Sequence, residues 1–385
     1  MKAIVFLLIS FIMMLFMGTV YTWSVFRVEV ETTYQLSTLQ SGVPYMISLF
    51  FYALSMMITG RILTLNNTRK IAFIGFLLIT LGWFLASQAS TLLVLSISYG
   101  ALLGFGVGMV YGVPVFMVQK QYQKSGLYTG IILAGFGASP LITAPLVYQL
   151  IDMLGLNETF LVMTFISAFL FIPLTLTLKT KNEALLIEVV QKSFSIKTYQ
   201  ILYGIFLIAT TIGLMMIGLS YRIGVLNYGF NTTHIALSLS FFAVLNGLAR
   251  PIFGFLMDKK GFIFSARLSA SLIIIASIIA LINQGNSIQL YIVSMGIFWF
   301  NLGAFLAMLP ASIKHYFGTF NYAKRYGFMF TSYGLGAIVG TILSGILLDL
   351  FSATHYVYIL ILISTVIMFM LLAFLTRHIS HYTKA

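Results

Sequence analysis

Two polar residues in one apolar segment are the best candidates for ligand chemistry in this sequence. Asn246 and Arg250 lie within LNGLARPIFGFLMDKKG (245–261), ahead of the first acidic side chain of that segment, Asp258. Residues four apart lie on one face of a helix, so the amide and the guanidinium are expected to face the same way. A guanidinium stays charged at physiological pH and can donate two parallel hydrogen bonds to a carboxylate. The pair therefore predicts recognition of an anion.

The composition around this pair predicts helices that cross a membrane. Of the 385 residues, 60% are hydrophobic and 8% are charged, and the mean hydropathy of +1.03 is far above that of soluble domains. Lipid offers the backbone no hydrogen-bond partners, so apolar runs of about 20 residues indicate transmembrane helices. We predict an all-α membrane protein with twelve such helices. The expected spans are 3–26, 42–64, 69–88, 91–118, 126–150, 159–179, 199–221, 234–257, 262–283, 287–313, 322–348 and 354–377.

The first run, 3–26, is too long for a signal peptide and lacks a cleavage pattern, so we interpret it as a retained span. With the N-terminus inside, all but three of the 21 basic residues fall in cytoplasmic segments. This distribution predicts a cell-membrane protein with both termini in the cytoplasm, and it explains the net charge of +13 without nucleic acid. The exceptions are Arg27 and Arg222, assigned to outer loops, and Arg250.

The longest polar segment, KTKNEALLIEVVQKSFSIK, divides the spans into two sets of six. We predict an N-terminal six-helix half over residues 1–179, a cytoplasmic linker over 180–198 and a C-terminal six-helix half over 199–385. Weak repeats relate the second span to the eighth, and the fourth and fifth spans to the tenth and eleventh. Related halves with a site near the membrane midplane are typical of alternating-access transporters.

Arg250 is expected to lie about 12 Å from the end of its helix, counting back from Asp258 at 1.5 Å per residue. A charge at that depth costs roughly 2.5 to 3.5 kcal/mol in lipid. All eight acidic residues are assigned to loops or span ends, so we expect the counter-ion to be an external anion. The alternatives are that Arg250 binds carbonyls freed by Pro251, or that it contacts the other half as a gate.

A family resemblance rests on a set of segments that occur in order along the chain. They are GTVYTWSVF (18–26), GFGVGMVYG (104–112), TGIILAGFG (129–137), NGLARPIFG (246–254), GFLMDKKG (254–261) and YGFMFTSYGLGAIVG (326–340). With the twelve spans, they resemble the major facilitator superfamily and, within it, the oxalate/formate antiporter family. The stretch around Arg250 is also similar to animal monocarboxylate transporters. The resemblance implies a two-half transporter of small organic anions in which Arg250 binds the substrate carboxylate.

The family pattern implies a second cation in the eleventh span, which holds the far carboxylate of oxalate. Here Tyr333 occupies that position, and no Lys or Arg occurs from Tyr326 to Leu348. One cation balances one negative charge, so a monocarboxylate such as formate, lactate or pyruvate is favoured over oxalate. Arg222 is the alternative second cation, although at a span end it is expected to extend to the surface.

Aromatic residues that match the substrate cage of the family complete the predicted site. They are Tyr21, Tyr111, Phe136 and Trp299. Each has an ordinary alternative, because aromatic side chains in membrane proteins also pack between helices or lie at the lipid interface. We predict that these four residues and Tyr333 surround the Asn246 and Arg250 pair.

The residue at position 246 bears on energy coupling. In proton-coupled monocarboxylate transporters of similar sequence this position is an aspartate, which can take the proton. Asparagine cannot titrate, so exchange or facilitated uptake is favoured over proton symport. His234 and His315 could titrate near neutral pH, but both are assigned to span ends.

Asp258, Lys259 and Arg61 are predicted to control the cytoplasmic face. Asp258 and Lys259 match the loop motif that latches this face in the superfamily. Its counterpart in the first half, GRILTLNNTRK (60–70), has asparagine where aspartate is expected. The recurring glycines of the fourth, fifth and eleventh spans are interpreted as close helix packing rather than as a dinucleotide motif.

Other classes of protein fit less well. The chain has no cysteine and five scattered histidines, which do not supply the clustered groups of a membrane enzyme. We predict no enzyme activity, cofactor, metal or nucleic-acid partner, and we expect a monomer in the lipid bilayer. A sensor with this fold would be expected to carry a soluble signalling domain. The main alternative is a proton-coupled symporter, or an exporter of another small solute or drug, although exporters of cations usually place a carboxylate in the membrane.

Overall fold

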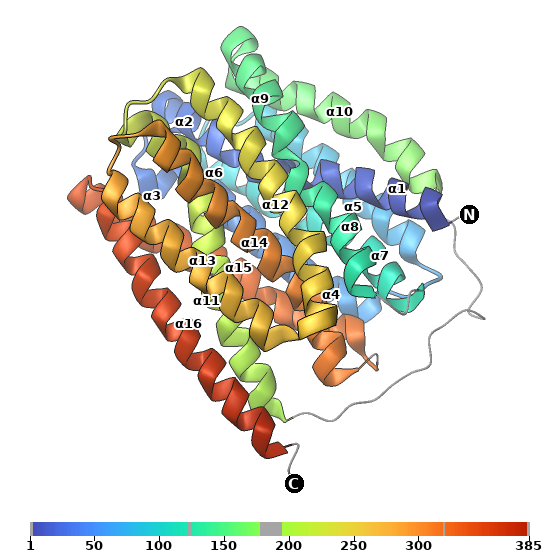
Figure 1. The fold of residues 1–385 in the computed structure, drawn as a ribbon. Coiled ribbons are helices and arrows are strands. Elements are labelled where there is room, and N and C mark those ends of the chain that lie inside the picture. Colours follow the sequence, from blue (N-terminus) through green and yellow to red (C-terminus); the bar gives the residue numbers. More distant parts are fainter. Residues whose placement is uncertain (1–2, 122–124, 178–194, 319, 383–385) are drawn as a thin grey trace.

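The computed structural model describes residues 3–121, 125–177, 195–318 and 320–382, and its elements are helices (Figure 1). The first half comprises α1 (Ala3–Met17), η1 (Gly18–Thr22), α2 (Trp23–Tyr34), α3 (Thr38–Ser41), α4 (Val43–Ile62), α5 (Thr68–Ser87), α6 (Leu92–Leu95), η2 (Ser96–Leu103), α7 (Gly104–Gln121), α8 (Ser125–Ala138), α9 (Pro140–Leu154) and α10 (Leu156–Thr177).

The second half has fewer breaks. It comprises α11 (Ile196–Arg222), η4 (Ile223–Asn227), α12 (Thr232–Lys260), α13 (Phe262–Asn283), α14 (Ile288–Phe317), α15 (Tyr322–Phe351) and α16 (His355–Tyr382). Pro251 and Pro310 lie inside α12 and α14 without ending them, whereas Pro140 occupies the first turn of α9 and separates it from α8. A proline is tolerated in the first turn because the N–H that it lacks has no partner there.

The helices have the length and apolar character that a membrane requires. Among the described residues, 11 helical segments qualify as candidate spans, and Leu156–Leu170 of α10 forms a shorter apolar helix at the position of the sixth expected span. The prediction of an all-α membrane protein is therefore confirmed. Most of the predicted linker (180–198) lies outside the described residues, and its last residues already belong to α11, so the domain boundaries stay predictions.

The two halves meet along pairs of long helices. In the first pair α4 packs along α15, and in the second α12 packs along α8 (Figure 1). The sequence repeat relates α4 to α12 and the α8 region to α15, so one contact is the counterpart of the other. Such a symmetric interface places residues from both halves around one central axis.

The first span is longer than predicted. Hydropathy ends it at Phe26, but η1 and α2 continue the helix to Tyr34, and the candidate membrane span covers Val5–Tyr34. Arg27 is only 1% exposed and Glu31 9%. The assignment of Arg27 to an outer loop is therefore wrong, and Arg250 is not the only buried charge inside the bundle. These charges can stay buried because each has partners in the fold, described below.

Candidate binding site

Arg250 lies in the middle of α12 with no exposed surface. Its Nη1 donates a hydrogen bond to the carbonyl oxygen of Leu133 at 2.7 Å, and its Nη2 donates to Asn246 Oδ1 at 3.1 Å. The guanidinium also lies over the ring of Phe136, with Cζ 5.5 Å from the ring centroid. Leu133 and Phe136 belong to α8, so Arg250 connects the two halves. This contact agrees with the alternative in which Arg250 contacts the other half.

Two glycines of α8 make this approach possible. A β-carbon built on Gly137 would overlap Asn246 Oδ1 and lie 3.0 Å from Arg250 Nε. On Gly130, a β-carbon would lie 2.8 Å from the carbonyl oxygen of Arg250. Any side chain at these positions would push α8 away from α12, so the interpretation of these glycines as close-packing residues is confirmed.

Asn246 is fully buried one turn before Arg250. Its Nδ2 donates to the carbonyl oxygen of Trp299 in α14 at 2.6 Å, which leaves Oδ1 to accept from Arg250. The amide is thus oriented from one side by α14 and orients the guanidinium on the other. Asn246 therefore positions Arg250 through a hydrogen bond that does not depend on pH.

Within the part of the chain that the structure describes, the charge of Arg250 has no carboxylate partner. Among the described residues it forms no ion pair, and its Nε and the Nε1 of Trp299 are buried without a hydrogen-bond partner. Buried donors are normally satisfied, because leaving one unpaired costs about 1 to 3 kcal/mol. An unneutralised guanidinium with a free donor is what an anion-binding site requires.

The aromatic residues predicted from the sequence gather around this arginine. Phe136 lies 5.0 Å from Tyr21 and 5.3 Å from Tyr111 between ring centroids, and Trp299 lies 6.4 Å from Tyr21. Tyr333 donates a hydrogen bond to the hydroxyl of Tyr21 at 3.0 Å. The structure therefore brings together all seven residues predicted for the site, from both halves.

Sequence reasoning missed two members of this cage. Tyr52 of α4 lies 5.2 Å from Tyr111 and 5.4 Å from Tyr333, and Phe330 of α15 lies 4.9 Å from Tyr333 and 5.1 Å from Tyr52. Phe330 comes three residues before Tyr333, a spacing that places both on one helix face and could have revealed it. Tyr52 had no such local signal beyond its place in the repeated second span.

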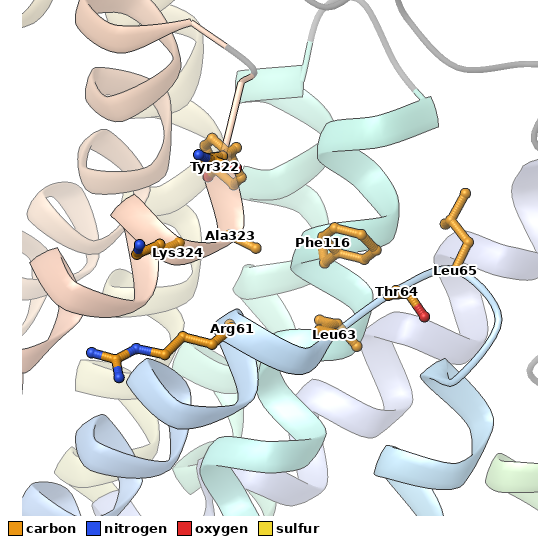
Figure 2. Close-up of a pocket in the computed structure, with 10 residues that line it drawn as sticks. Arg61, Leu63, Thr64, Leu65, Phe116, Tyr322, Ala323 and Lys324 are labelled. Atoms are coloured by element: carbon orange, nitrogen blue, oxygen red, sulfur yellow. The ribbon is translucent and has the colours of Figure 1, made fainter.

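A cavity of about 670 Å³ opens between the halves at one end of the bundle, which we name the Arg61 end. Figure 2 shows its lining, with Tyr322, Ala323 and Lys324 of α15 on one side and Leu63, Thr64 and Phe116 on the other. Deeper in, the cavity narrows to a space of about 10 Å³ lined by Met56, Gly112 and Tyr326, among others. Tyr326 lies 5.7 Å from Phe330, so this constriction separates the cavity from the aromatic cage.

The residues predicted to act as gates lie at this end, but in different surroundings. Arg61 lines the cavity, together with Lys324. Asp258 and Lys259 are exposed at the end of α12, where Asp258 interacts electrostatically with Lys314 of α14 in the same half. Lys259 Nζ lies over the ring of Phe255 at 5.8 Å. The gating role of these three residues stays a prediction.

The opposite end, which we name the Glu31 end, is held by charged contacts. Glu31 receives hydrogen bonds from Arg222 Nε at 2.9 and 3.1 Å, and its Oε1 lies 3.6 Å from Arg27 Nε. Arg222 was named as an alternative second cation, although it was expected to extend to the surface. It instead pairs with Glu31 of the first half at the end of α11.

Comparisons with known proteins identify the family of this chain. The family model of the Major Facilitator Superfamily matches residues 5–301 and 227–384, so the chain belongs to this superfamily of membrane transporters. It is 24% identical over 338 residues to the uncharacterized MFS-type transporter YhjX of Escherichia coli (strain K12), covering 84% of this chain and 82% of that protein.

Two further relatives carry more specific names. The chain is 24% identical over 341 residues to the oxalate:formate antiporter of Oxalobacter formigenes, covering 86% of this chain and 81% of that protein. It is 32% identical to human monocarboxylate transporter 11 over 90 residues, which are 23% of this chain and 19% of that protein. The predicted resemblance to the major facilitator superfamily, with relatives among oxalate/formate and monocarboxylate transporters, is confirmed.

Proposed function

We propose that this protein carries small carboxylate anions across a cell membrane by alternating access, with Arg250 as the carboxylate ligand. The observation that carries the proposal is the buried guanidinium of Arg250, which has no carboxylate partner among the described residues and keeps a free Nε donor. A substrate carboxylate would supply the missing charge and accept from this fork of N–H groups. The named relatives that exchange or carry carboxylates support the same cargo.

The favoured cargo is a monoanion such as formate, lactate or pyruvate. Tyr333 lies where the family pattern implies a second cation, and it donates to Tyr21 rather than to a charged group. A hydroxyl can bind a hydroxyl or keto oxygen of the substrate but does not balance a second negative charge. Oxalate, with two carboxylates, would leave one charge uncompensated in a desolvated site.

Exchange is the favoured mode of transport. Asn246 holds the position of a proton-carrying aspartate in similar symporters, and both ends of its amide are hydrogen-bonded in place. Arg250 bridges the halves through a hydrogen bond to the carbonyl oxygen of Leu133. An incoming anion would compete with that carbonyl for the guanidinium, so the halves would be released when substrate binds.

The distribution of basic residues supports an orientation with both termini, and therefore the Arg61 end, in the cytoplasm. The cavity at that end is then the route by which cytoplasmic anions approach the site. The Glu31 end faces outward, and we expect a monomer to be sufficient because the cage is built within one chain.

A counterflow assay with purified protein in liposomes tests this function. Vesicles are loaded with formate, lactate, pyruvate or oxalate, and uptake of a radiolabelled anion is measured with each. We expect the fastest exchange with a monocarboxylate and a loss of about 100-fold for Arg250→Gln, since removing one member of a buried charge pair costs about 2 to 5 kcal/mol. The conservative Arg250→Lys keeps the charge but loses the fork, and should recover only part of the rate.

The matched control is Arg69→Gln, which neutralises an exposed arginine at the start of α5. Wild-type exchange in Arg250→Gln would exclude a carboxylate ligand at this position. Uptake driven by a pH gradient into vesicles without internal anion would instead indicate a proton symporter. Transport of a cationic solute with no anion exchange would indicate the exporter.

A further inference from the structure

The Glu31 end holds a set of charged contacts that each cross from one half to the other. Arg27 Nη1 donates to the carbonyl oxygen of Gly218 in α11 at 2.9 Å, and Arg222 of α11 bonds Glu31 of α2. Asp349 of α15 accepts from the backbone N–H groups of Thr38 and Leu39 at 3.0 and 3.1 Å. The described contacts thus connect α2 and α3 of the first half with α11 and α15 of the second.

The charged groups of this network also form hydrogen bonds with neighbouring residues of their own half. Arg27 also donates through Nε to Ser41 Oγ at 3.0 Å and through Nη2 to the carbonyl oxygen of Thr38 at 2.5 Å. Ser41 Oγ in turn donates to Glu31 Oε1 at 2.6 Å. Two arginines face two carboxylates, Glu31 and Asp349, so the charges within the cluster balance. In this closed arrangement the charges are buried, so removing one member would leave another charge buried without a partner.

These contacts must break when the two halves separate at this end. A transporter that opens its central site toward the Glu31 end moves α11 and α15 away from α2 and α3. That movement separates Arg222 from Glu31, Arg27 from Gly218, and Asp349 from the α3 backbone. At the Arg61 end, in contrast, the halves already enclose a cavity.

We propose that Arg27, Glu31, Arg222 and Asp349 form an outer lock that holds the Glu31 ends of the two halves together and sets the resting state of the empty transporter. The lock rests on the proposed function for its alternating access and for the direction called outer. Its residues lie apart from the Arg250 site, so the lock controls which side the site faces rather than what the site binds.

Cysteine labelling of the full-length purified protein tests the lock directly. The chain contains no native cysteine, so single reporters can be introduced without other changes. Thr341→Cys reports on the Glu31 end, because Thr341 is 4% exposed and its Cγ2 would lie 2.5 Å from a β-carbon built on Gly42 of the other half. Thr59→Cys reports on the Arg61 end, since Thr59 lines the inner constriction.

Glu31→Gln removes the charge that both arginines contact, and Glu29→Gln is the matched control. Glu29 lies on the same helix, and its carboxylate contacts the nearby hydroxyl of Thr33. We expect Glu31→Gln to raise the rate at which a water-soluble thiol reagent labels the Thr341→Cys reporter by about tenfold. This increase corresponds to only part of the free energy that breaking a buried ion pair costs. The same variant should slow labelling of the Thr59→Cys reporter, while Glu29→Gln leaves both rates unchanged.

The pair of reporters separates a lost lock from a loosened fold. General destabilisation would speed labelling at both ends, and that result would overturn the proposal. Equal labelling of the Thr341→Cys reporter in Glu31→Gln and Glu29→Gln would overturn it as well. Asp349→Asn tests the second contact independently should Glu31→Gln fail to fold, with an expected rise of about threefold for one weakened charge-assisted bond. Labelling needs no substrate, so its outcome is separate from that of the Arg250 transport assay.

Discussion

Arg27 and Arg250 are both buried arginines inside this helical bundle, yet their surroundings differ. Arg27 donates to Ser41, Thr38 and Gly218 and lies beside the carboxylate of Glu31. Arg250 donates to two neutral acceptors, its Nε has no partner, and no ion pair reaches it among the residues described. Among the described residues, the protein thus neutralises Arg27 with a carboxylate but not Arg250, the cation proposed to bind the substrate.

The comparison separates a structural role from a binding role for the same side chain. A cation whose donors and charge are all satisfied contributes to holding two helices together, and its removal leaves its partners exposed to an apolar interior. A buried cation without a counter-ion raises the free energy of the substrate-free protein. Binding of an anion removes that cost. Four changes to the protein test this distinction, with effects that decrease in the order given.

Arg27→Gln should destabilise the fold by about 3 kcal/mol, because Glu31, Ser41 and the carbonyls of Thr38 and Gly218 lose a shared partner. The measurement is the melting temperature of the detergent-purified protein, with exposed Arg69→Gln as the control. If the two variants melted at the same temperature, Arg27 would not be a structural cation.

Arg250→Gln should leave the melting temperature without substrate near wild type, because the loss of two hydrogen bonds is offset by the removal of an unneutralised buried charge, and it should abolish the stabilisation by substrate. A bound anion stabilises only the form that can bind it, by about 2.7 kcal/mol at 100 times its dissociation constant. The check is the shift in melting temperature with added formate, lactate or pyruvate. A full shift in Arg250→Gln would contradict the binding role.

Tyr333→Lys should convert the one-cation site into a two-cation site. We expect the preference for oxalate over formate in counterflow to rise by about tenfold, since a charge-assisted hydrogen bond contributes about 1.5 to 3 kcal/mol before the cost of burying the amine. Tyr333→Phe is the matched variant, because it removes the hydroxyl bonded to Tyr21 without adding charge. An equal change in both variants would show that shape, not charge, sets the preference.

Arg61→Gln should have the smallest effect, because Arg61 is exposed at the mouth of the cavity. We expect anion uptake from that side to slow by about twofold at low ionic strength, and the difference to vanish at high salt. Lys70→Gln, an exposed charge away from the cavity lining, is the control. A salt-independent loss would point to a gating role for Arg61 instead of attraction of anions.

Much of the fold and of the Arg250 site followed from local sequence patterns. Apolar runs marked the spans because each helix satisfies its own backbone, whatever its neighbours are. The spacing of Asn246 and Arg250 placed both on one face, and the structure joins them by a hydrogen bond. The recurring glycines of α8 marked a helix that approaches α12 closely.

The contacts of the charged residues at the Glu31 end could not be predicted from local sequence patterns. Hydropathy ended the first span before Arg27 because a window of sequence treats every charge as solvated. Glu31 and Arg222 are 191 positions apart, and their pairing depends on α2 and α11 lying side by side. Likewise, Tyr21 and Tyr333 are 312 positions apart and meet only when the halves close around the site.

The amino-acid sequence was sufficient to predict that the chain crosses a membrane in many apolar helices and that Arg250 lies within them beside an asparagine. These features depend on periodicity and on the cost of burying charge, which are local properties. Which interior charges have a carboxylate partner, and which have none among the described residues, became clear from the packing of the helices. That outcome depends on contacts between helices far apart in the sequence, where distances of about 3 Å decide whether a buried charge has a partner.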